Sequence, residues 1–175
     1  MPRPHDFPVP KESFDWIIRD AQISKCGSFR YQLTRRWGPG ALLPFIMLNP
    51  SVADAHFDDP TIRRCMGFAR REKKDGIVVA NLFALISTSP KGLIVVSDPF
   101  GPENDGAFTM VAREAELGGS PIVCAWGAGG GPKSALALAH LRQFRVSLVC
   151  LGKTRDGSPR HPLYVRADQP LIPLP

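Results

Sequence analysis

The stretch FIMLNPSVADAHFDDPTIRRC, residues 45–65, passes from a buried strand into a helix and decides the fold class. Its apolar start completes the run ALLPFIML, which is typical of a strand buried on both faces. Asn49-Pro50-Ser51 ends that strand, because proline lacks an amide donor and restricts the residue before it. Asp59 can cap the following helix and Pro60 suits its first position. The apolar face of this helix would consist of Ile62, Cys65, Met66 and Ala69.

The same alternation of strand and helix continues along the chain. GIVVANLF (76–83), PIVCAW (121–126) and VSLVCLG (146–152) read as further buried strands. Helices are expected after Gly101-Pro102 and over SALALAHLRQF (134–144). The pattern predicts a three-layer α/β/α sandwich with a mainly parallel central sheet of about four strands. SFRYQLTRRW (28–37) would add an N-terminal amphipathic strand, in which alternation places Phe29, Tyr31 and Leu33 on one face.

Length and composition indicate one globular domain. The chain has 175 residues, of which 43% are hydrophobic and 22% charged, so we expect a single α/β domain over residues 14–175. Residues 1–13 hold four prolines and are predicted to form an arm. No apolar run approaches the roughly 18 residues of a membrane span, and the polar opening lacks the apolar segment of a signal peptide. We therefore expect a cytoplasmic protein without a membrane partner.

The net charge and the cysteine spacing limit which partners and cofactors we expect the protein to bind. A net charge of +6 and a pI of about 9.5 allow an acidic partner such as nucleic acid, although many basic proteins bind none. The four cysteines stand far apart without a CxxC pair, so they are expected to be small core residues. We predict no cofactor.

Polar residues gather where the expected strands end, which is where ligands bind in such sheets. Asn49 follows the first buried strand, and Asn81 interrupts the second. A carboxamide there suits the edge of a nucleobase, although a turn at Asn49 and a structural hydrogen bond at Asn81 remain alternatives. The loop after the last strand, GKTRDGSPRHPLY (152–164), is basic and ends in an aromatic residue, which suits phosphate and base contacts or solubility alone.

Two other motifs suggest different chemistry. Asp54, His56 and Asp58 could hold a divalent cation or activate water, which would make a metal-assisted hydrolase. GAGGGPKS (127–134) nearly matches a phosphate-binding loop, but Pro132 replaces its final glycine and removes an amide donor. Neither pattern is complete, and we predict no metal.

The order of the motifs resembles known families. Most of the chain resembles the bacterial domain of unknown function 1643 family, through RYQLTRRWGPG, MLNPSVADAHFDDPTIRRCMGFAR, NLFAL, DPFGPENDGAF, CAWGA and GKTRDGSPRHPLY. More distantly, LNPS, ANLF, AWGA and HPLY follow one another as similar motifs do in the uracil-DNA glycosylase superfamily, and PENDGAF resembles a helix start found between them. HPLY stands where that superfamily has HPS.

The second resemblance implies a glycosylase-like hydrolase acting on a damaged or modified base in DNA or RNA, with DNA the favoured substrate, or on a nucleotide. Asn49 would position the attacking water, Asn81 would read the base and His161 would donate to the leaving base. Asp54 is a further catalytic candidate. Candidate base contacts are Phe57, Phe83 and Tyr164, and candidate phosphate contacts are Ser51, Lys153, Arg155, Ser158 and Arg160. The alternative is a non-catalytic nucleic-acid or nucleotide-binding module on the same fold.

Overall fold

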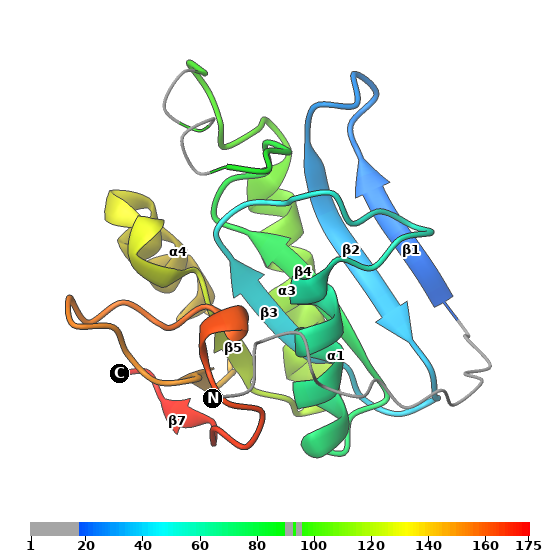
Figure 1. The fold of residues 1–175 in the computed structure, drawn as a ribbon, viewed down its shortest axis with the longest axis vertical. Coiled ribbons are helices and arrows are strands. Elements are labelled where there is room, and N and C mark those ends of the chain that lie inside the picture. The colour runs from blue at the N-terminus through cyan, green and yellow to red at the C-terminus, as the bar shows by residue number, and fades with distance from the viewer. Residues whose placement is uncertain (1–17, 90–92, 94–95) are drawn as a thin grey trace.

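The computed structural model describes residues 18–89, 93 and 96–175, so the arm predicted for residues 1–13 lies outside the described residues. The described part contains seven strands and three α-helices (Figure 1). The strands are β1 (Ile18–Ile23), β2 (Arg30–Arg36), β3 (Leu43–Met47), β4 (Gly76–Asn81), β5 (Ile122–Cys124), β6 (Leu148–Cys150) and β7 (Ile172–Pro173). The helices are α1 (Pro60–Arg71), α3 (Asn104–Gly118) and α4 (Gly131–Leu141), with short 3₁₀ turns η1 (Gly127–Gly129) and η2 (Pro162–Tyr164).

The sheet is mixed rather than mainly parallel. Its strand order is β1-β2-β4-β3-β5-β6-β7. The central strands β4, β3, β5 and β6 pair in parallel, whereas β1, β2 and β7 pair antiparallel at the two sides. The prediction of about four strands is therefore wrong in number and in type. β1 was missed because IRDAQI is mostly exposed and has no buried face to leave an apolar pattern.

A bulge in β2 contradicts the predicted alternation. Gln22 pairs with Gln32, but the next residue of β1, Ile23, pairs with Arg30, so Tyr31 is an extra residue in β2. A bulge of this kind reverses the face on which the preceding side chains lie. Tyr31 packs in the core beneath α3, whereas Leu33 packs in the core beneath α1. The expectation that these two residues share a face is wrong.

α1 covers one face of the sheet as its sequence predicts. The Asp59 side chain caps it by accepting from the Ile62 amide, and Pro60 is its first residue. The buried side chains of α1 are Ile62, Cys65, Met66, Phe68 and Ala69. They pack against β3 and β4 residues in one core cluster. A capped, amphipathic helix that connects two adjacent parallel strands is the standard crossover of an α/β fold.

α3 and α4 cover the opposite face (Figure 1). The apolar side chains of α3, namely Phe108, Val111, Ala112 and Ala115, are all buried in the second core cluster. α4 adds Ala137 and Leu141 to that cluster. Three of the cysteines are buried, and Cys26 is exposed. Among the described residues, no helix has both the length and the apolar character that a membrane crossing requires.

Candidate functional site

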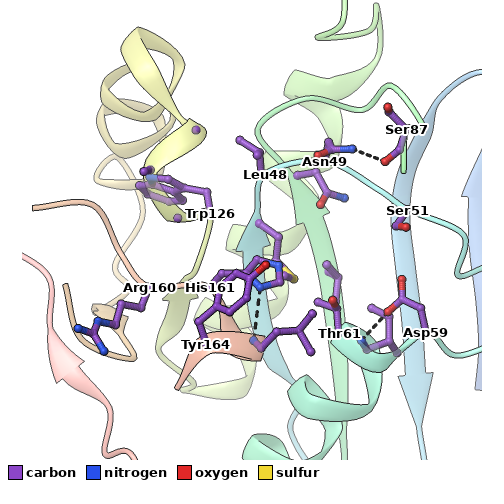
Figure 2. Close-up of a pocket in the computed structure, with 18 of the residues that line it drawn as sticks. Leu48, Asn49, Ser51, Asp59, Thr61, Ser87, Trp126, Arg160, His161 and Tyr164 are labelled. Carbon is purple, nitrogen blue, oxygen red and sulfur yellow. Dashed lines mark hydrogen bonds between the residues drawn. The ribbon is translucent and has the colours of Figure 1, made fainter. Parts of the chain in front are cut away.

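A cavity of about 1050 Å³ lies at the carboxyl ends of the parallel strands (Figure 2). Asn49, Asn81 and His161 all line it, although they come from three separate segments of the chain. Parallel strands bring their carboxyl ends to one edge of a sheet, which explains why these residues meet. The volume is at the upper end of the range for small-molecule sites. The cavity is thus large enough for a nucleotide.

Asn81 is the last residue of β4 and is only 2% exposed. Its backbone oxygen accepts from the Asn104 side chain at 3.0 Å. Its own Nδ2 is buried and has no hydrogen-bond partner among the described residues. A buried amide without a partner carries a free-energy cost of about 1–3 kcal/mol. A ligand in the cavity could remove that cost by accepting from Asn81.

Asn49 follows β3 and connects two loops at the cavity rim. Its Nδ2 donates to the backbone oxygen of Pro50 at 3.0 Å. The same nitrogen donates to the backbone oxygen of Ser87 at 2.8 Å (Figure 2). Both partners are acceptors, which fixes the orientation of the amide and leaves Oδ1 for another donor. Asn49 therefore has a structural role in addition to any contact with a ligand.

His161 is held as a neutral donor. The Leu163 amide donates to its Nδ1 at 3.3 Å, so the neutral ring carries its proton on Nε2. Burial lowers the pKa of His161, and the charge of Asp59 opposes that shift. Arg64 on α1 positions this segment by donating to the Pro162 oxygen at 3.2 Å.

Gly127 connects the loop after β5 to the segment that contains His161. Gly127 has a φ of +71°, a backbone conformation that residues other than glycine rarely adopt. Its amide donates to the Pro159 oxygen at 2.8 Å, two residues before His161. The glycine-rich loop therefore shapes the cavity wall, while Lys133 lies over the Phe100 ring and does not line the cavity.

Arg30 and Asp59 are buried charges in the cavity that the sequence did not identify as ligand contacts. Arg30 is 3% exposed, and its Nη1 donates to the Ala53 oxygen. Its Nε is buried without a hydrogen-bond partner among the described residues. Burial lowers its pKa to about 10, and the nearby Asp59 carboxylate opposes the shift. Asp59 is 5% exposed, and the cap bond to Ile62 occupies its Oδ1 at 2.9 Å.

Of the three aromatic residues expected in the cavity, Tyr164 lines it, and Phe57 and Phe83 do not. Tyr164 lines it and is 79% exposed, with its ring centroid 5.6 Å from that of His161. Phe57 and Phe83 do not line it: Phe57 is 52% exposed outside the cavity, and Phe83 packs against the core beneath α3. The buried aromatic of the wall is Trp126. The sequence singles out AWGA only because it resembles a glycosylase-superfamily motif. Its spacing does not predict that the Trp126 indole lines the cavity.

Only some of the predicted phosphate contacts reach the cavity. Ser51, Arg155 and Arg160 line it, whereas Lys153 and Ser158 do not. The Lys153 oxygen accepts from Arg160 Nε at 3.0 Å, and the Ser158 backbone closes a turn within the same loop. Arg155 and Arg160 are exposed and supply positive charge at the mouth.

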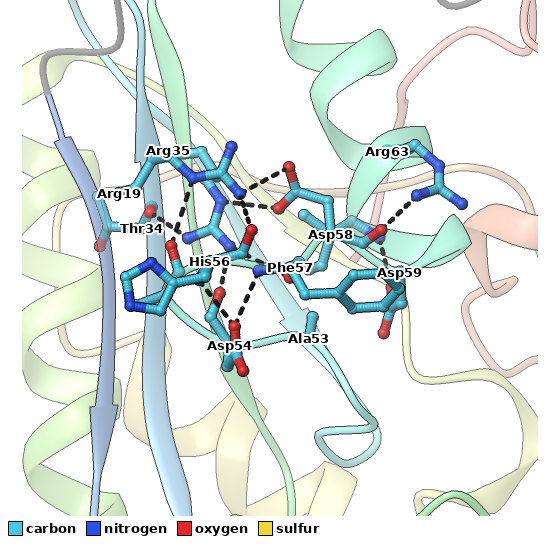
Figure 3. A network of polar contacts seen from close by, with 12 residues as sticks. Arg19, Thr34, Arg35, Ala53, Asp54, His56, Phe57, Asp58, Asp59 and Arg63 are labelled. Carbon is cyan, nitrogen blue, oxygen red and sulfur yellow. Dashed lines mark hydrogen bonds and ion pairs between the residues drawn. The ribbon is translucent and has the colours of Figure 1, made fainter.

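The acidic loop 53–58 is docked on the sheet by buried arginines (Figure 3). Asp54 does not line the cavity; its Oδ1 accepts from the amides of His56 at 2.7 Å and Phe57 at 2.8 Å, which lowers its pKa. Asp58 accepts from Arg35 Nε at 2.8 Å and pairs with Arg19 at 3.3 Å. We therefore assign Asp54 no part in the chemistry of the cavity. Within the described residues, no three His, Cys, Asp or Glu side chains gather into a possible metal site.

Comparison with known proteins identifies a family whose activity is not known. A family described as a protein of unknown function (DUF1643) matches residues 30–163. None of the curated proteins matches the chain, and none of the solved structures does.

Proposed function

Because the chain belongs to the DUF1643 family, whose function is unknown, its activity has to be inferred from the cavity, and we propose that it hydrolyses the N-glycosidic bond of a damaged or modified nucleotide. The observation that carries the proposal is the convergence of Asn49, Asn81 and His161 on one cavity. The substrate is a base in DNA or RNA, with DNA favoured, or a free nucleotide. The order of the motifs LNPS, ANLF, AWGA and HPLY supports the same class of reaction.

Each of the three residues has a distinct part. The unpartnered amide of Asn81 reads an acceptor on the base. Oδ1 of Asn49 accepts a hydrogen bond from water and directs the water oxygen at the anomeric carbon. Nε2 of His161 donates to the base, which receives the electron pair of the broken carbon–nitrogen bond. The water oxygen becomes the sugar hydroxyl, and the proton it loses is finally taken up by the base.

The walls and mouth suit the rest of a nucleotide. Trp126 and Tyr164 offer aromatic surface for the base or sugar, and aromatic stacking tolerates any base. Arg155 and Arg160 hold the phosphate where it stays hydrated. Binding through such contacts weakens with added salt.

A non-catalytic binding module is the second candidate. It is favoured by the hydrogen bond from Asn49 to the Ser87 oxygen, which connects two loops and gives Asn49 a structural role without any chemistry. The two candidates share the cavity and differ only in turnover.

Two substitutions at His161 separate hydrolysis from binding. Asparagine places an acceptor near the position of Nδ1 and keeps the bond from Leu163, but it lacks a donor at Nε2. Glutamine places an amide donor near Nε2. Base release is measured from oligonucleotides and free nucleotides carrying uracil, hypoxanthine and other modified bases. We expect His161→Asn to lower the rate about 10²- to 10³-fold and His161→Gln to retain more of it.

The phosphate contacts have a matched control. Arg155→Gln should weaken nucleotide binding and reduce its salt dependence, while Lys153→Gln, in the same loop but outside the cavity, should change neither. If nucleotides bind but the wild-type protein releases no base from any substrate, the binding module replaces the hydrolase. If no nucleotide binds at all, both candidates are wrong.

A further inference from the structure

Three buried polar side chains form the inner wall of the cavity: Arg30, Asp59 and Asn81, each at most 5% exposed. They differ in what they offer a ligand. Arg30 only donates, Asp59 only accepts, and Asn81 can do either. The bulge at Tyr31 brings Arg30 to this wall, since regular alternation would have placed it on the opposite face of β2 from Leu33.

Arg30 and Asp59 are near enough for the carboxylate to raise the Arg30 pKa, but they do not form a direct ion pair. Among the ion pairs of the described residues there is none between Arg30 and Asp59. Arg30 keeps its Nε unpartnered. Asp59 uses Oδ1 for the helix cap, and Figure 2 shows its other oxygen turned away from that amide. A buried cation and a buried anion that face one cavity without pairing call for a ligand carrying acceptors for one and donors for the other.

From this arrangement, and on the premise of the nucleotide site proposed above, we propose that the cavity selects a guanine-type base, a 2-amino-6-oxopurine. Its O6 and N7 present two adjacent acceptors, which match the arginine fork of Arg30. Its N1–H and 2-amino group present two adjacent donors on the neighbouring edge, which match the carboxylate of Asp59. Asn81 contributes a further amide at the same wall.

A phosphate group is a poorer occupant of the inner wall. It would accept from Arg30, but its negative charge would lie beside the Asp59 carboxylate, which is itself 95% buried in the same cavity and repels it. The exposed arginines at the mouth offer phosphate a site without that repulsion. The base therefore lies against the inner wall, and the phosphate lies at the mouth of the cavity.

The test compares ligands that differ by one group. Calorimetry with the full chain measures the affinity for guanosine, inosine and adenosine monophosphates; inosine monophosphate lacks only the 2-amino group. We expect guanosine monophosphate to bind at least about tenfold more tightly than inosine monophosphate. In Asp59→Asn, where asparagine keeps the helix cap, this ratio should fall to about one. With wild-type protein alone, 7-deazaguanosine monophosphate, which lacks the N7 acceptor, should also bind about tenfold more weakly.

The outcomes separate this inference from the proposed reaction. Equal affinity for the guanosine and inosine nucleotides, or an undiminished ratio in Asp59→Asn, overturns the assignment of the base while leaving a nucleotide site. Full affinity for the 7-deaza nucleotide overturns the role of Arg30 even if the variant does not fold. Base release from the same nucleotides is measured in parallel. Selective binding with no base release from these nucleotides or from any of the modified substrates above would support guanine selection and contradict the hydrolase.

Discussion

Replacing Arg35 by methionine should destabilise the protein by about 3 kcal/mol. The Arg35 side chain is 0% exposed and its Nε donates to Asp58 at 2.8 Å. The other guanidinium nitrogens donate to the backbone oxygens of Asp20, Thr34, Asp54 and Phe57 (Figure 3). Methionine preserves much of the apolar volume but removes every one of these donors.

The size of this destabilisation depends on how well the remaining Asp58 carboxylate is compensated. Removing one partner of a buried ion pair costs about 3–5 kcal/mol, because the remaining charge is uncompensated. Asp58 is 14% exposed and keeps Arg19 at 3.3 Å, so we expect the lower end of that range. For a chain of this length the loss corresponds to a fall in Tm of about 6–12 °C.

Thermal and urea unfolding of Arg35→Met, Asp58→Asn and the double variant measure the effect. The two residues are in contact, so we expect a coupling of about 1–3 kcal/mol. Arg166→Met is the control: its pair with Asp168 is exposed, and no change in Tm is expected. A fall of less than about 2 °C for Arg35→Met, or strictly additive effects of the two substitutions, would refute the structural role given to this ion pair.

Two further predictions concern glycine packing and pH. Gly76→Ala should prevent stable folding or lower Tm strongly, because a Cβ there would lie 2.3 Å from the Arg35 oxygen and 2.4 Å from Leu42. Gly67→Ala, on the exposed side of α1 with nothing within 4 Å, should instead stabilise by up to about 1 kcal/mol; equal Tm changes for the two variants would contradict the packing at β4. Burial lowers the pKa of His161 below 6.5, so the unfolded chain binds more protons than the folded one between the two pKa values. Stability should therefore decrease as pH falls through 6.5 toward the folded pKa, and His161→Gln should show a smaller decrease; identical profiles of Tm against pH would be evidence against this burial.

Several parts of the fold could be predicted because their signals are local. The Asp59 cap and the apolar face of α1 depend on residues within about one or two helical turns of each other. Each of the four central strands depends on the residues of that strand alone. The meeting of Asn49 and Asn81 could also be predicted, because the ends of neighbouring parallel strands share an edge. These expectations needed spacing and residue type, and no knowledge of remote contacts.

Other parts of the site could not be predicted, because each depends on a partner far away in the chain. The bulge at Tyr31 exists only in relation to β1, and the burial of Arg35 depends on Asp58, 23 residues further along. Asp54 and Phe57 belong to the same acidic loop, yet the arginines of the sheet hold that loop so that neither lines the cavity.

The sequence by itself determined the order of the central strands β3 to β6 and of the helices between them, the start of α1 and the polar ends of those strands, since these follow from periodicity and capping within short segments. Only the tertiary structure decided that β2 carries a bulge, that Arg30 joins Asp59 and Asn81 at one inner wall, and that Asp54 stays outside it. The physical reason is that a charged side chain becomes buried only where non-local pairing encloses it, and a linear pattern does not specify that pairing.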